Sequence, residues 1–430
     1  MAARKKTRQP GMTSAITGAG IRVMLYAHDT LGLGHIHRSL RIAQALRDRY
    51  PEMSILQITG SPQAYRYRYP PRVDYVKLPS VFKVGDDRYD PRYLNMPFQS
   101  ILELRTSIIL ETAKRYRPHM LLVDHKPLGM KEELLPTLRW LQACDNPPFT
   151  VLGMRDILDE PGAVKKIWTE KGIYRAFSDF YDHIAIYGCP DIFDPVSSYD
   201  FPPDVRSKTS FCGYISDGDS EERAIQHREM SHRNDRKLVL VTTAGGDGAG
   251  ELIIGNYLDA LRSYRSDIPF DSLIVTGPFI PDELWNRFKR ESRHLPVRLL
   301  KYVSGMSAFI NRSDLVVSTA GYNSLTDILA FARRALLIPR TVFREYKHDE
   351  QLIRAERFSS LGLVSFMHPD RVRPGLLLET VESMLAGKDS PLDKARIEKM
   401  IPLDGRQRLM DFLTERLATI RHDMETGPQS

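Results

Sequence analysis

The chain has 430 residues, of which 42% are hydrophobic and 27% are charged, and its net charge is +7 at pH 7. This composition is ordinary for a soluble globular protein, and the length exceeds what one hydrophobic core supports, so two domains are predicted. The three cysteines form no CxxC pair, which argues against a disulfide framework or a zinc site and fits a reducing cytoplasm.

Four of the positive charges lie in an N-terminal tail that contains no acid and is expected to be disordered: Arg4, Lys5, Lys6 and Arg8. They leave +3 for the rest of the chain, and no nucleic-acid partner is expected. No apolar run reaches the roughly 18 residues of a membrane span, and no apolar segment of a signal peptide follows the basic tail. We therefore expect a cytoplasmic protein, with peripheral contact at the inner face of a membrane as an open alternative.

In chain order, apolar segments typical of buried strands alternate with helical segments, in two series. The first series of predicted strands covers 21–27, 53–59, 119–125, 149–156 and 183–188, with a helix at 38–50. The second series covers 237–243, 271–277, 297–303, 314–319, 335–340 and 362–366, and a final helix is expected at 406–420. Continuous apolar strands suit parallel sheets, so we predict an α/β protein with two doubly wound Rossmann-like domains facing across a cleft.

The domain boundaries follow from where this alternation stops and restarts. A polar stretch separates the two series and is expected to be a linker. The predicted units are a disordered tail at 1–20, an N-terminal domain at 21–213, the linker at 214–236, a C-terminal domain at 237–404, and a terminal helix and tail at 405–430.

Ligands of such sheets bind beyond the carboxyl ends of the strands, which selects the loops after the first strand of each domain. The first loop holds Gly32, Gly34 and His35 before a helix, an arrangement that favours phosphate. A dinucleotide site fits poorly, because His37 replaces the third glycine and the next strand ends at Gly60 without an acid. No GxxxxGK[ST] motif occurs, which argues against a P-loop NTPase.

Three segments of the second half carry a more specific signal: the glycine loop TAGGDGAGE (243–251), STAGYNSLTD (318–327) and YKHDEQLIRAERFSSLGL (346–363). Together with the Gly34-His35 loop they resemble GT-B glycosyltransferases of the MurG-like kind, which use nucleotide-diphosphate sugars. The resemblance implies an acceptor-side N-terminal domain, a donor-side C-terminal domain and chemistry in the cleft between them.

The resemblance also implies roles for individual residues. His35 is the candidate base that deprotonates the acceptor hydroxyl. Asp327, near the start of a predicted helix, falls where the family has a glutamate on the ribose. Glu350-Gln351 replaces two glutamines near the donor sugar, and Arg38 replaces a proline that follows the family's histidine. The full expected donor set is Gly34, Ala244, Gly245, Gly246, Asp247, Gly248, Val303, Gly321, Asn323, Ser324, Asp327, Glu350 and Gln351.

Strand ends of the N-terminal domain supply further candidates. Asp124 and His125 could assist the base, and Arg155 and Asp156 could bind the acceptor. The alternative for all four is a buried salt-bridge network that holds the loops. For His35 and the glycine loops, helix capping and ordinary tight turns are the structural alternatives.

We therefore predict a glycosyltransferase that moves a sugar from a nucleoside diphosphate sugar, UDP-linked, to an unidentified hydroxyl of a glycan, lipid or small molecule. Amide groups of the phosphate loops can stabilise the leaving diphosphate, so the reaction is expected to be metal-independent and free of cofactors. We also expect it to proceed with inversion. A nucleotide-sugar epimerase of the same architecture and a non-catalytic sugar-nucleotide-binding protein remain the alternatives.

Overall fold

The structure is a computed structural model that describes residues 20–29, 32–85, 87–216, 236–243, 250–264, 267–340, 349–388 and 391–426, with two short strands between 342 and 347. The predicted tail up to residue 19, most of the predicted linker (217–235) and the glycine loop 244–249 lie outside the described residues.

The N-terminal half builds a seven-stranded parallel sheet in the order β3-β2-β1-β6-β7-β8-β9. Its strands are β1 (Arg22–Ala27), β2 (Ser54–Thr59), β3 (Val73–Lys77), β6 (Met120–Asp124), β7 (Phe149–Arg155), β8 (His183–Tyr187) and β9 (Thr209–Phe211). The five predicted strands are all present. The two edge strands β3 and β9 were not predicted, since neither is a continuous apolar run.

The C-terminal half builds a six-stranded parallel sheet in the order β12-β11-β10-β13-β14-β17. All six strands fall within or one residue outside the predicted segments: β10 (Lys237–Thr242), β11 (Phe270–Val275), β12 (Val297–Leu300), β13 (Leu315–Ser318), β14 (Ala335–Leu337) and β17 (Ser365–Phe366). Two antiparallel hairpins lie outside the sheets: β4 (Val81–Gly85) with β5 (Arg88–Pro91), and β15 (Val342–Phe343) with β16 (Tyr346–Lys347).

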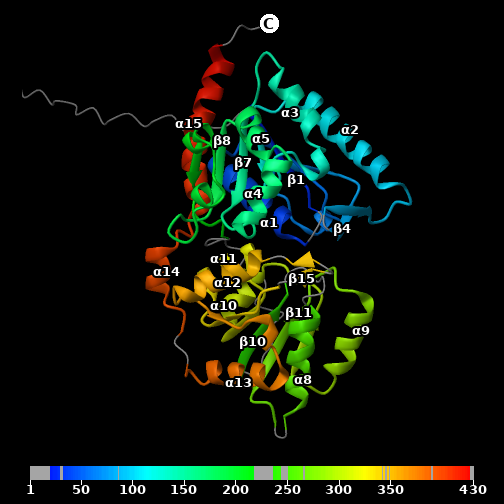
Figure 1. Ribbon diagram of the computed structural model, residues 1–430, viewed down its shortest axis with the longest axis vertical. Helices are drawn as coiled ribbons and strands as arrows, with labels where there is room; N and C mark the ends of the chain where they lie inside the picture. Colours follow the sequence, from blue (N-terminus) through cyan, green and yellow to red (C-terminus); the bar gives the residue numbers. More distant parts are fainter. Residues whose placement is uncertain are drawn as a thin grey trace, which may run out of the picture.

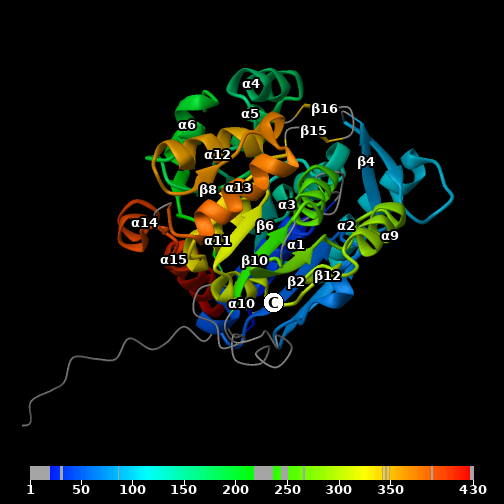
Figure 2. The same ribbon diagram turned by 90° about the horizontal axis from the view of Figure 1, so that it is seen from below.

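Helices cover both faces of each sheet (Figures 1 and 2). On the N-terminal sheet, one face carries α1 (Gly34–Arg49) and α15 (Gly405–Thr426), and the other carries α2 (Phe98–Tyr116), α3 (Leu135–Gln142), α4 (Pro161–Glu170), α5 (Ile173–Phe180) and α7 (Pro203–Ser207). On the C-terminal sheet, one face carries α8 (Asn256–Arg262), α9 (Asp282–Glu291) and α13 (Pro374–Leu385). The other face carries α10 (Met306–Arg312), α11 (Tyr322–Phe331), α12 (Glu350–Ser360) and α14 (Lys394–Met400). The short α6 (Pro195–Ser198) follows β8.

One hydrophobic core runs through both halves of the molecule. It joins Ile42 and Leu46 of α1 to Leu325 and Ile328 of α11, and all four side chains are buried. Separate cores lie on the outer face of each sheet. The two sheets are therefore joined through α1 and α11.

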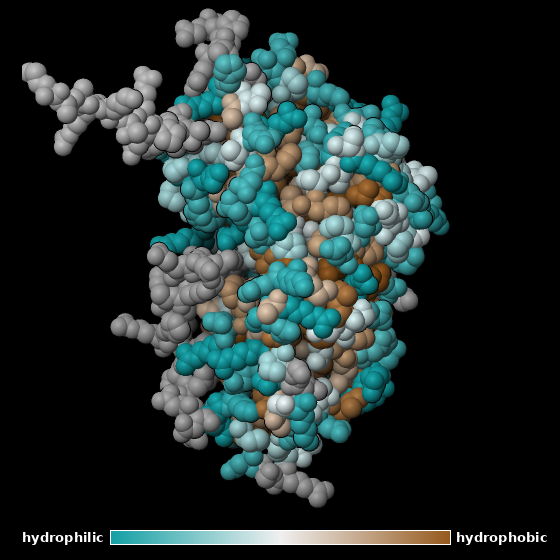
Figure 3. All heavy atoms as spheres, turned by 90° about the vertical axis from the view of Figure 1, so that its left-hand side faces the viewer, coloured by the Kyte–Doolittle hydropathy of each residue, from teal (hydrophilic) through white to brown (hydrophobic). Residues whose placement is uncertain are grey.

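The last helix, α15, returns from the C-terminal half and packs against α1 (Figure 1). Its apolar side chains Leu409, Leu413 and Leu417 are fully buried in the shared core. The side of the molecule that carries α14 and α15 mixes hydrophilic and hydrophobic side chains (Figure 3). Within the described residues, no helix has the length and apolar character to cross a membrane.

Candidate active site

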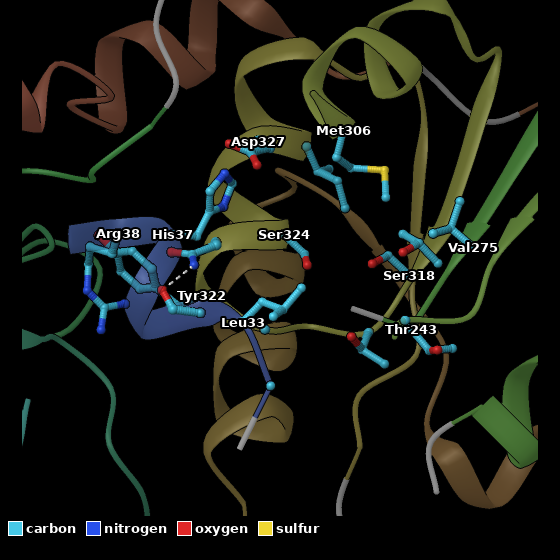
Figure 4. A pocket seen from close by; sticks show the side chains of 18 of the residues that line it. Leu33, His37, Arg38, Thr243, Val275, Met306, Ser318, Tyr322, Ser324 and Asp327 are labelled. Atoms are coloured by element: carbon cyan, nitrogen blue, oxygen red, sulfur yellow. Dashed lines mark hydrogen bonds between the residues drawn. The ribbon is translucent and has the colours of Figure 1, made fainter. Parts of the chain in front are cut away.

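A cavity of about 330 Å³ lies between the two sheets, at the carboxyl ends of their strands. Figure 4 shows His37 and Arg38 of α1 on one side, Ser324 and Asp327 of α11 in the middle, and the strand-end residues Thr243, Val275 and Ser318 on the other side. The cavity therefore occupies the place where open α/β sheets bind ligands, and both halves contribute to its wall.

The start of α1 forms one wall of the cavity. Gly32 adopts φ +65°, a backbone conformation that favours glycine and lets the chain turn off β1. The buried Asp29 carboxylate accepts a hydrogen bond from the backbone N–H of Ile36 at 2.9 Å, which satisfies one open donor of the helix. Gly34 and His35 are thereby held at the first turn of α1, facing the cavity.

His35 is paired with Asp124, the last residue of β6. The distance from His35 Nδ1 to Asp124 Oδ2 is 2.6 Å, and Asp124 is fully buried. Arg38, one turn further along α1, donates from Nε to Oδ1 at 2.8 Å and from Nη2 to Oδ2 at 2.7 Å. The sequence analysis placed His35 and Asp124 in one catalytic set, and the structure brings these two side chains into contact.

This contact determines the charge of the Asp124 carboxyl and which ring nitrogen of His35 faces it. Burial alone would raise the pKa of Asp124, but the Arg38 charge and the hydrogen bonds from His35 and Arg38 lower it to about 2. An ionised carboxylate can only accept a hydrogen bond, so we infer that His35 carries its proton on Nδ1. The lone pair of His35 Nε2 is then available to take a proton from a hydroxyl.

Two further histidines lie beside His35. The ring centroids of His28 and His125 lie 4.5 Å and 5.5 Å from that of His35. Burial, followed by neighbouring positive charges, lowers the pKa of both His28 and His125 well below the usual range, so both are neutral near pH 7. His125 is outside the cavity wall, and its backbone has φ +71°, a strained conformation of a non-glycine residue.

The first turn of α11 faces the first turn of α1 across the cavity. Gly321 precedes the helix, and Asn323 and Ser324 lie in its first turn; all three line the cavity, as does Val303 in the loop before α10. Asn323 Nδ2 donates to the Gly34 carbonyl at 2.8 Å, which joins the two helix starts directly. Two helix N-termini that meet at one cavity make a site with a strong preference for anions.

Asp327 lines the cavity but differs from its expected setting. It lies in the second turn of α11 and is 3% exposed. Both of its carboxylate oxygens accept hydrogen bonds from Arg41 Nη2 of α1, at 2.7 Å and 2.8 Å. A ribose at this position would therefore contact a carboxylate that already accepts hydrogen bonds from Arg41 of the N-terminal half.

Glu350 and Gln351, at the start of α12, also line the cavity. Glu350 forms ion pairs with Arg155, at the end of β7, and with Arg354, whose Nη1 lies 2.9 Å from Oε1. Burial would raise the pKa of Glu350, but the two arginines outweigh it and lower that pKa. Arg155 lines the same cavity, so the predicted acceptor residue and the predicted donor residue are in direct contact.

Asp156 was expected at the cleft, and the structure places it elsewhere. Its side chain is fully buried below the cavity wall and accepts a hydrogen bond from Tyr214 Oη at 2.5 Å. Burial is the main reason why the pKa of Asp156 is raised. The structural alternative for it was a buried salt-bridge network that holds the loops, and the structure shows it hydrogen-bonded to a buried tyrosine and to the Ile157 backbone N–H.

Five predicted donor residues cannot be compared, because Ala244, Gly245, Gly246, Asp247 and Gly248 lie outside the described residues. Further cavity residues were not named as site residues, among them Tyr67, Thr242, Thr243, Ser318, Thr319, Tyr322 and Arg340, although four of them lie in the loops 243–251 and 318–327 that the sequence analysis selected. The strand-end threonines and serine could have been found from the rule that ligands meet strand carboxyl ends. Among the described residues, no group of three or more His, Cys, Asp or Glu side chains could hold a metal ion.

Comparison with known proteins supports the same architecture. Residues 260–408 match the model of the glycosyltransferase family 28 C-terminal domain. The UDP-N-acetylglucosamine–N-acetylmuramyl-(pentapeptide) pyrophosphoryl-undecaprenol N-acetylglucosamine transferase of Acetivibrio thermocellus is 23% identical over 89% of this chain and 95% of its own length. The transferase of the same name from Clostridium kluyveri is 29% identical over 40% of this chain and 46% of its own length.

Solved structures agree on the fold. MurG of Acinetobacter baumannii matches with a TM-score of 0.50 and 12% identity, over 90% of this chain and 95% of its own. The calicheamicin glycosyltransferase CalG4 matches with a TM-score of 0.55 and 15% identity, over 95% of this chain and 100% of its own. A UDP-N-acetylglucosamine 2-epimerase of Listeria monocytogenes, described in its structure as putative, has a TM-score of 0.52 at 12% identity, over 86% of this chain and 89% of its own. The fold is therefore GT-B, an architecture that transferases and epimerases share.

Proposed function

We propose that this chain, a MurG-like nucleotide-sugar glycosyltransferase of the GT-B fold, uses a UDP-sugar and His35 to glycosylate a hydroxyl with inversion and without a metal ion. The observation that carries the proposal is the His35–Asp124 pair, with its carboxylate buried, at the wall of a cavity that both domains line. The match to the transferases favours transfer over the epimerase alternative.

The proposed step is a single displacement. His35 Nε2 takes the proton of the acceptor hydroxyl as its oxygen attacks the anomeric carbon of the sugar. The bond from that carbon to the UDP oxygen breaks, and UDP leaves on the opposite face, which inverts the configuration. Asp124 stabilises the imidazolium that forms, because its carboxylate is already ionised and hydrogen-bonded to Nδ1.

The proposed place for the UDP phosphates is between the first turns of α1 and α11. The backbone N–H groups there carry the partial positive charge that the leaving diphosphate needs. Val303 is the proposed contact of the uracil base, and Asp327 that of the ribose. Gln351 lines the cavity beside Glu350 and is the proposed contact of the donor sugar.

Because backbone amides take the role of a cation in this proposal, activity should persist in excess EDTA. Measuring UDP release from the donor before and after chelation checks this. Complete loss that magnesium or manganese restores would contradict the mechanism.

One experiment separates the candidate functions. The protein is incubated with radiolabelled UDP-N-acetylglucosamine, the donor in the names of the relatives, alone and with a panel of hydroxyl acceptors. Release of UDP with a labelled product supports transfer, and an isomerised donor without an acceptor supports an epimerase. Binding of UDP by calorimetry with no turnover of this donor or other UDP-sugars would support the non-catalytic alternative.

For the acceptor we propose a lipid-linked compound, the class printed in the relatives' names, reached by peripheral contact at the cytoplasmic face of a membrane. Tyr93, Leu94 and Met96, between β5 and α2, are large apolar side chains that are 70%, 47% and 43% exposed. Co-sedimentation with anionic vesicles, lost when all three are changed to serine, is the expected result. Equal sedimentation of the variant would refute this contact.

A further inference from the structure

Arg38 contacts two residues on different sides of the cavity: Asp124 of the N-terminal sheet and Tyr322 of α11. On one side it holds both oxygens of Asp124, with donor–acceptor distances of 2.8 Å and 2.7 Å. On the other side its guanidinium carbon lies 5.4 Å from the ring centroid of Tyr322, the first residue of α11. We propose that Arg38 is a positioning residue that orients the catalytic carboxylate and links it to the helix that faces the donor.

The orientation follows from the geometry of the two donors. A guanidinium that binds both oxygens of a carboxylate fixes its plane as well as its distance, which a single hydrogen bond cannot do. Asp124 Oδ2 accepts from Arg38 and from His35 Nδ1 together. The direction of the His35 ring is thus set by the same carboxylate that Arg38 holds.

The guanidinium itself is enclosed by aromatic rings. Tyr187, at the end of β8 in the N-terminal sheet, lies on it with a centroid distance of 5.8 Å. Tyr322 packs against it from the C-terminal half, and Tyr322 Oη accepts a hydrogen bond from the Ile215 backbone N–H at 3.1 Å. Arg38 is only 2% exposed, so it cannot leave this place without moving one of the rings.

The charge of Arg38 also acts on the base. Arg38 Nη2 lies 3.2 Å from His35 Nδ1, and both atoms are donors once His35 is protonated on Nδ1. The two donors also share one acceptor, because His35 Nδ1 and Arg38 Nη2 both bind Asp124 Oδ2. Removal of the guanidinium should therefore change the length and direction of the His35–Asp124 hydrogen bond.

Other charged and titratable groups also surround the base. After β1 and β6 these are His28, Asp29, His125 and Lys126, with Arg155 at the end of β7 and the Arg41–Asp327 pair between α1 and α11. The Arg38 charge acts on Arg155 as well, so the effect of an Arg38 variant is judged against a matched control.

The test compares Arg38→Met with Arg105→Met. Arg105 is a matched control, because it is also fully buried and binds both oxygens of a carboxylate, that of Glu133, at 2.5 Å and 2.6 Å. The rate is measured as UDP release from UDP-N-acetylglucosamine with water as the acceptor. UDP affinity comes from calorimetry, and the hydrogen-bonded His35 Nδ1 proton is followed in the downfield proton NMR spectrum.

We expect Arg38→Met to lower kcat about 10- to 100-fold, because the base is no longer held in one direction. UDP affinity should stay within about threefold, because Arg38 holds the base and not the nucleotide. Addition of UDP should shift the Nδ1 proton signal in the native protein, and Arg38→Met should abolish this shift. Arg38→Lys, which keeps the charge without the fork, should recover part of the rate.

A kcat and an Nδ1 signal in Arg38→Met that match those of Arg105→Met would overturn the proposal, because both arginines would then be purely structural. If Arg38→Met does not fold, an Arg38→Lys variant with native kcat and native NMR response would overturn it as well. The inference rests on the proposed function, but the two can fail separately. Absence of UDP binding to the native protein would refute the donor site. The NMR signal of Arg38→Met without UDP tests only the link between Arg38 and Asp124.

Discussion

His35 and His37 are two residues apart on α1, yet their surroundings differ. His35 donates to Asp124, whereas His37 lines the cavity beside the ring of Tyr67, at a centroid distance of 6.2 Å. We expect His35→Ala to lower turnover by about 10²- to 10⁴-fold with little change in UDP affinity, the usual effect of losing a general base. Turnover and calorimetry with the native protein and both variants check this. The matched His37→Ala should lower turnover much less, and equal, small effects of both variants would place the base elsewhere.

Among single residues, the sequence correctly predicted cavity residues that lie in or beside a short local motif. Gly34, His35, Gly321 and Gln351 are in or beside short motifs, and all four line the cavity. The residues that were missed have partners far away in the chain. Arg38 binds a residue 86 positions later, and Arg41 binds one 286 positions later, so no local pattern identifies either pair.

The start of α1 is held by the buried carboxyl of Asp29, and this makes the free energy of unfolding depend on pH. Burial raises the pKa of Asp29 to about 6, against the hydrogen bonds from Thr59 and Ile36 that would lower it. A carboxyl whose pKa is raised on folding contributes stability below its unfolded value near 4, and this contribution is lost as the pH rises through 6.

We therefore expect the free energy of unfolding of the native protein to fall relative to Asp29→Asn by roughly 3 kcal/mol between pH 4 and pH 7. The asparagine can still accept the Ile36 N–H, so the helix start is kept. Urea unfolding of both proteins across this pH range measures the difference. A constant difference would show that Asp29 does not titrate in this window.

The contact between α1 and α11 contains the buried Arg41–Asp327 pair. Asp327→Ala leaves a buried guanidinium without this carboxylate and should cost about 3–5 kcal/mol of unfolding free energy. It should also weaken UDP binding by about 1–3 kcal/mol if the carboxylate holds the ribose. The double variant Arg41→Met/Asp327→Leu should regain most of the stability but not the affinity. A loss of stability in the double variant equal to the sum of the losses in Arg41→Met and Asp327→Leu would show that the pair is not coupled.

Most predicted strands are buried, but the half-buried edge strands β12 and β17 of the C-terminal sheet were predicted as well. The central strands are continuous apolar runs because helices cover both of their faces, and all of them were predicted. The edge strand β3 alternates apolar and polar residues, and β9 has only three residues. The β4–β5 hairpin was missed because it packs outside the sheets, against Phe98 and Ile101 of α2.

At the scale of the whole molecule, α15 joins the two ends of the chain. Besides its buried leucines, Thr414 contacts the hydroxyl of Tyr50, and Phe412 stacks on His183 with a centroid distance of 3.8 Å. We expect Leu413→Ala to cost about 2–5 kcal/mol, since it opens a cavity in the shared core. Glu415→Ala, on the exposed side of the same helix, should stay within about 0.5 kcal/mol. Urea unfolding gives both values, and equal effects would mean that α15 does not stabilise the fold.

The two-domain architecture was predictable from the two strand series, since each series encodes one sheet through local patterns. The side on which the last helix packs was not predictable. The segment 406–420 is predicted as a helix with no strand after it, and no local pattern identifies the helix or sheet against which it packs. The core that α15 completes includes residues as early as Ile21 and as late as Leu417.

The position of α15 sets an order of events during synthesis. A ribosome releases residues 21–216 long before it makes 405–420, so the growing chain holds the N-terminal sheet while α1 lacks its cover. Tyr50, whose hydroxyl contacts Thr414 of α15, would then lack this partner until the last helix is made, and apolar surface exposed in this way attracts chaperones and other nascent chains. The N-terminal half of this protein is therefore synthesised first, but its packing is complete only after the last helix has been synthesised.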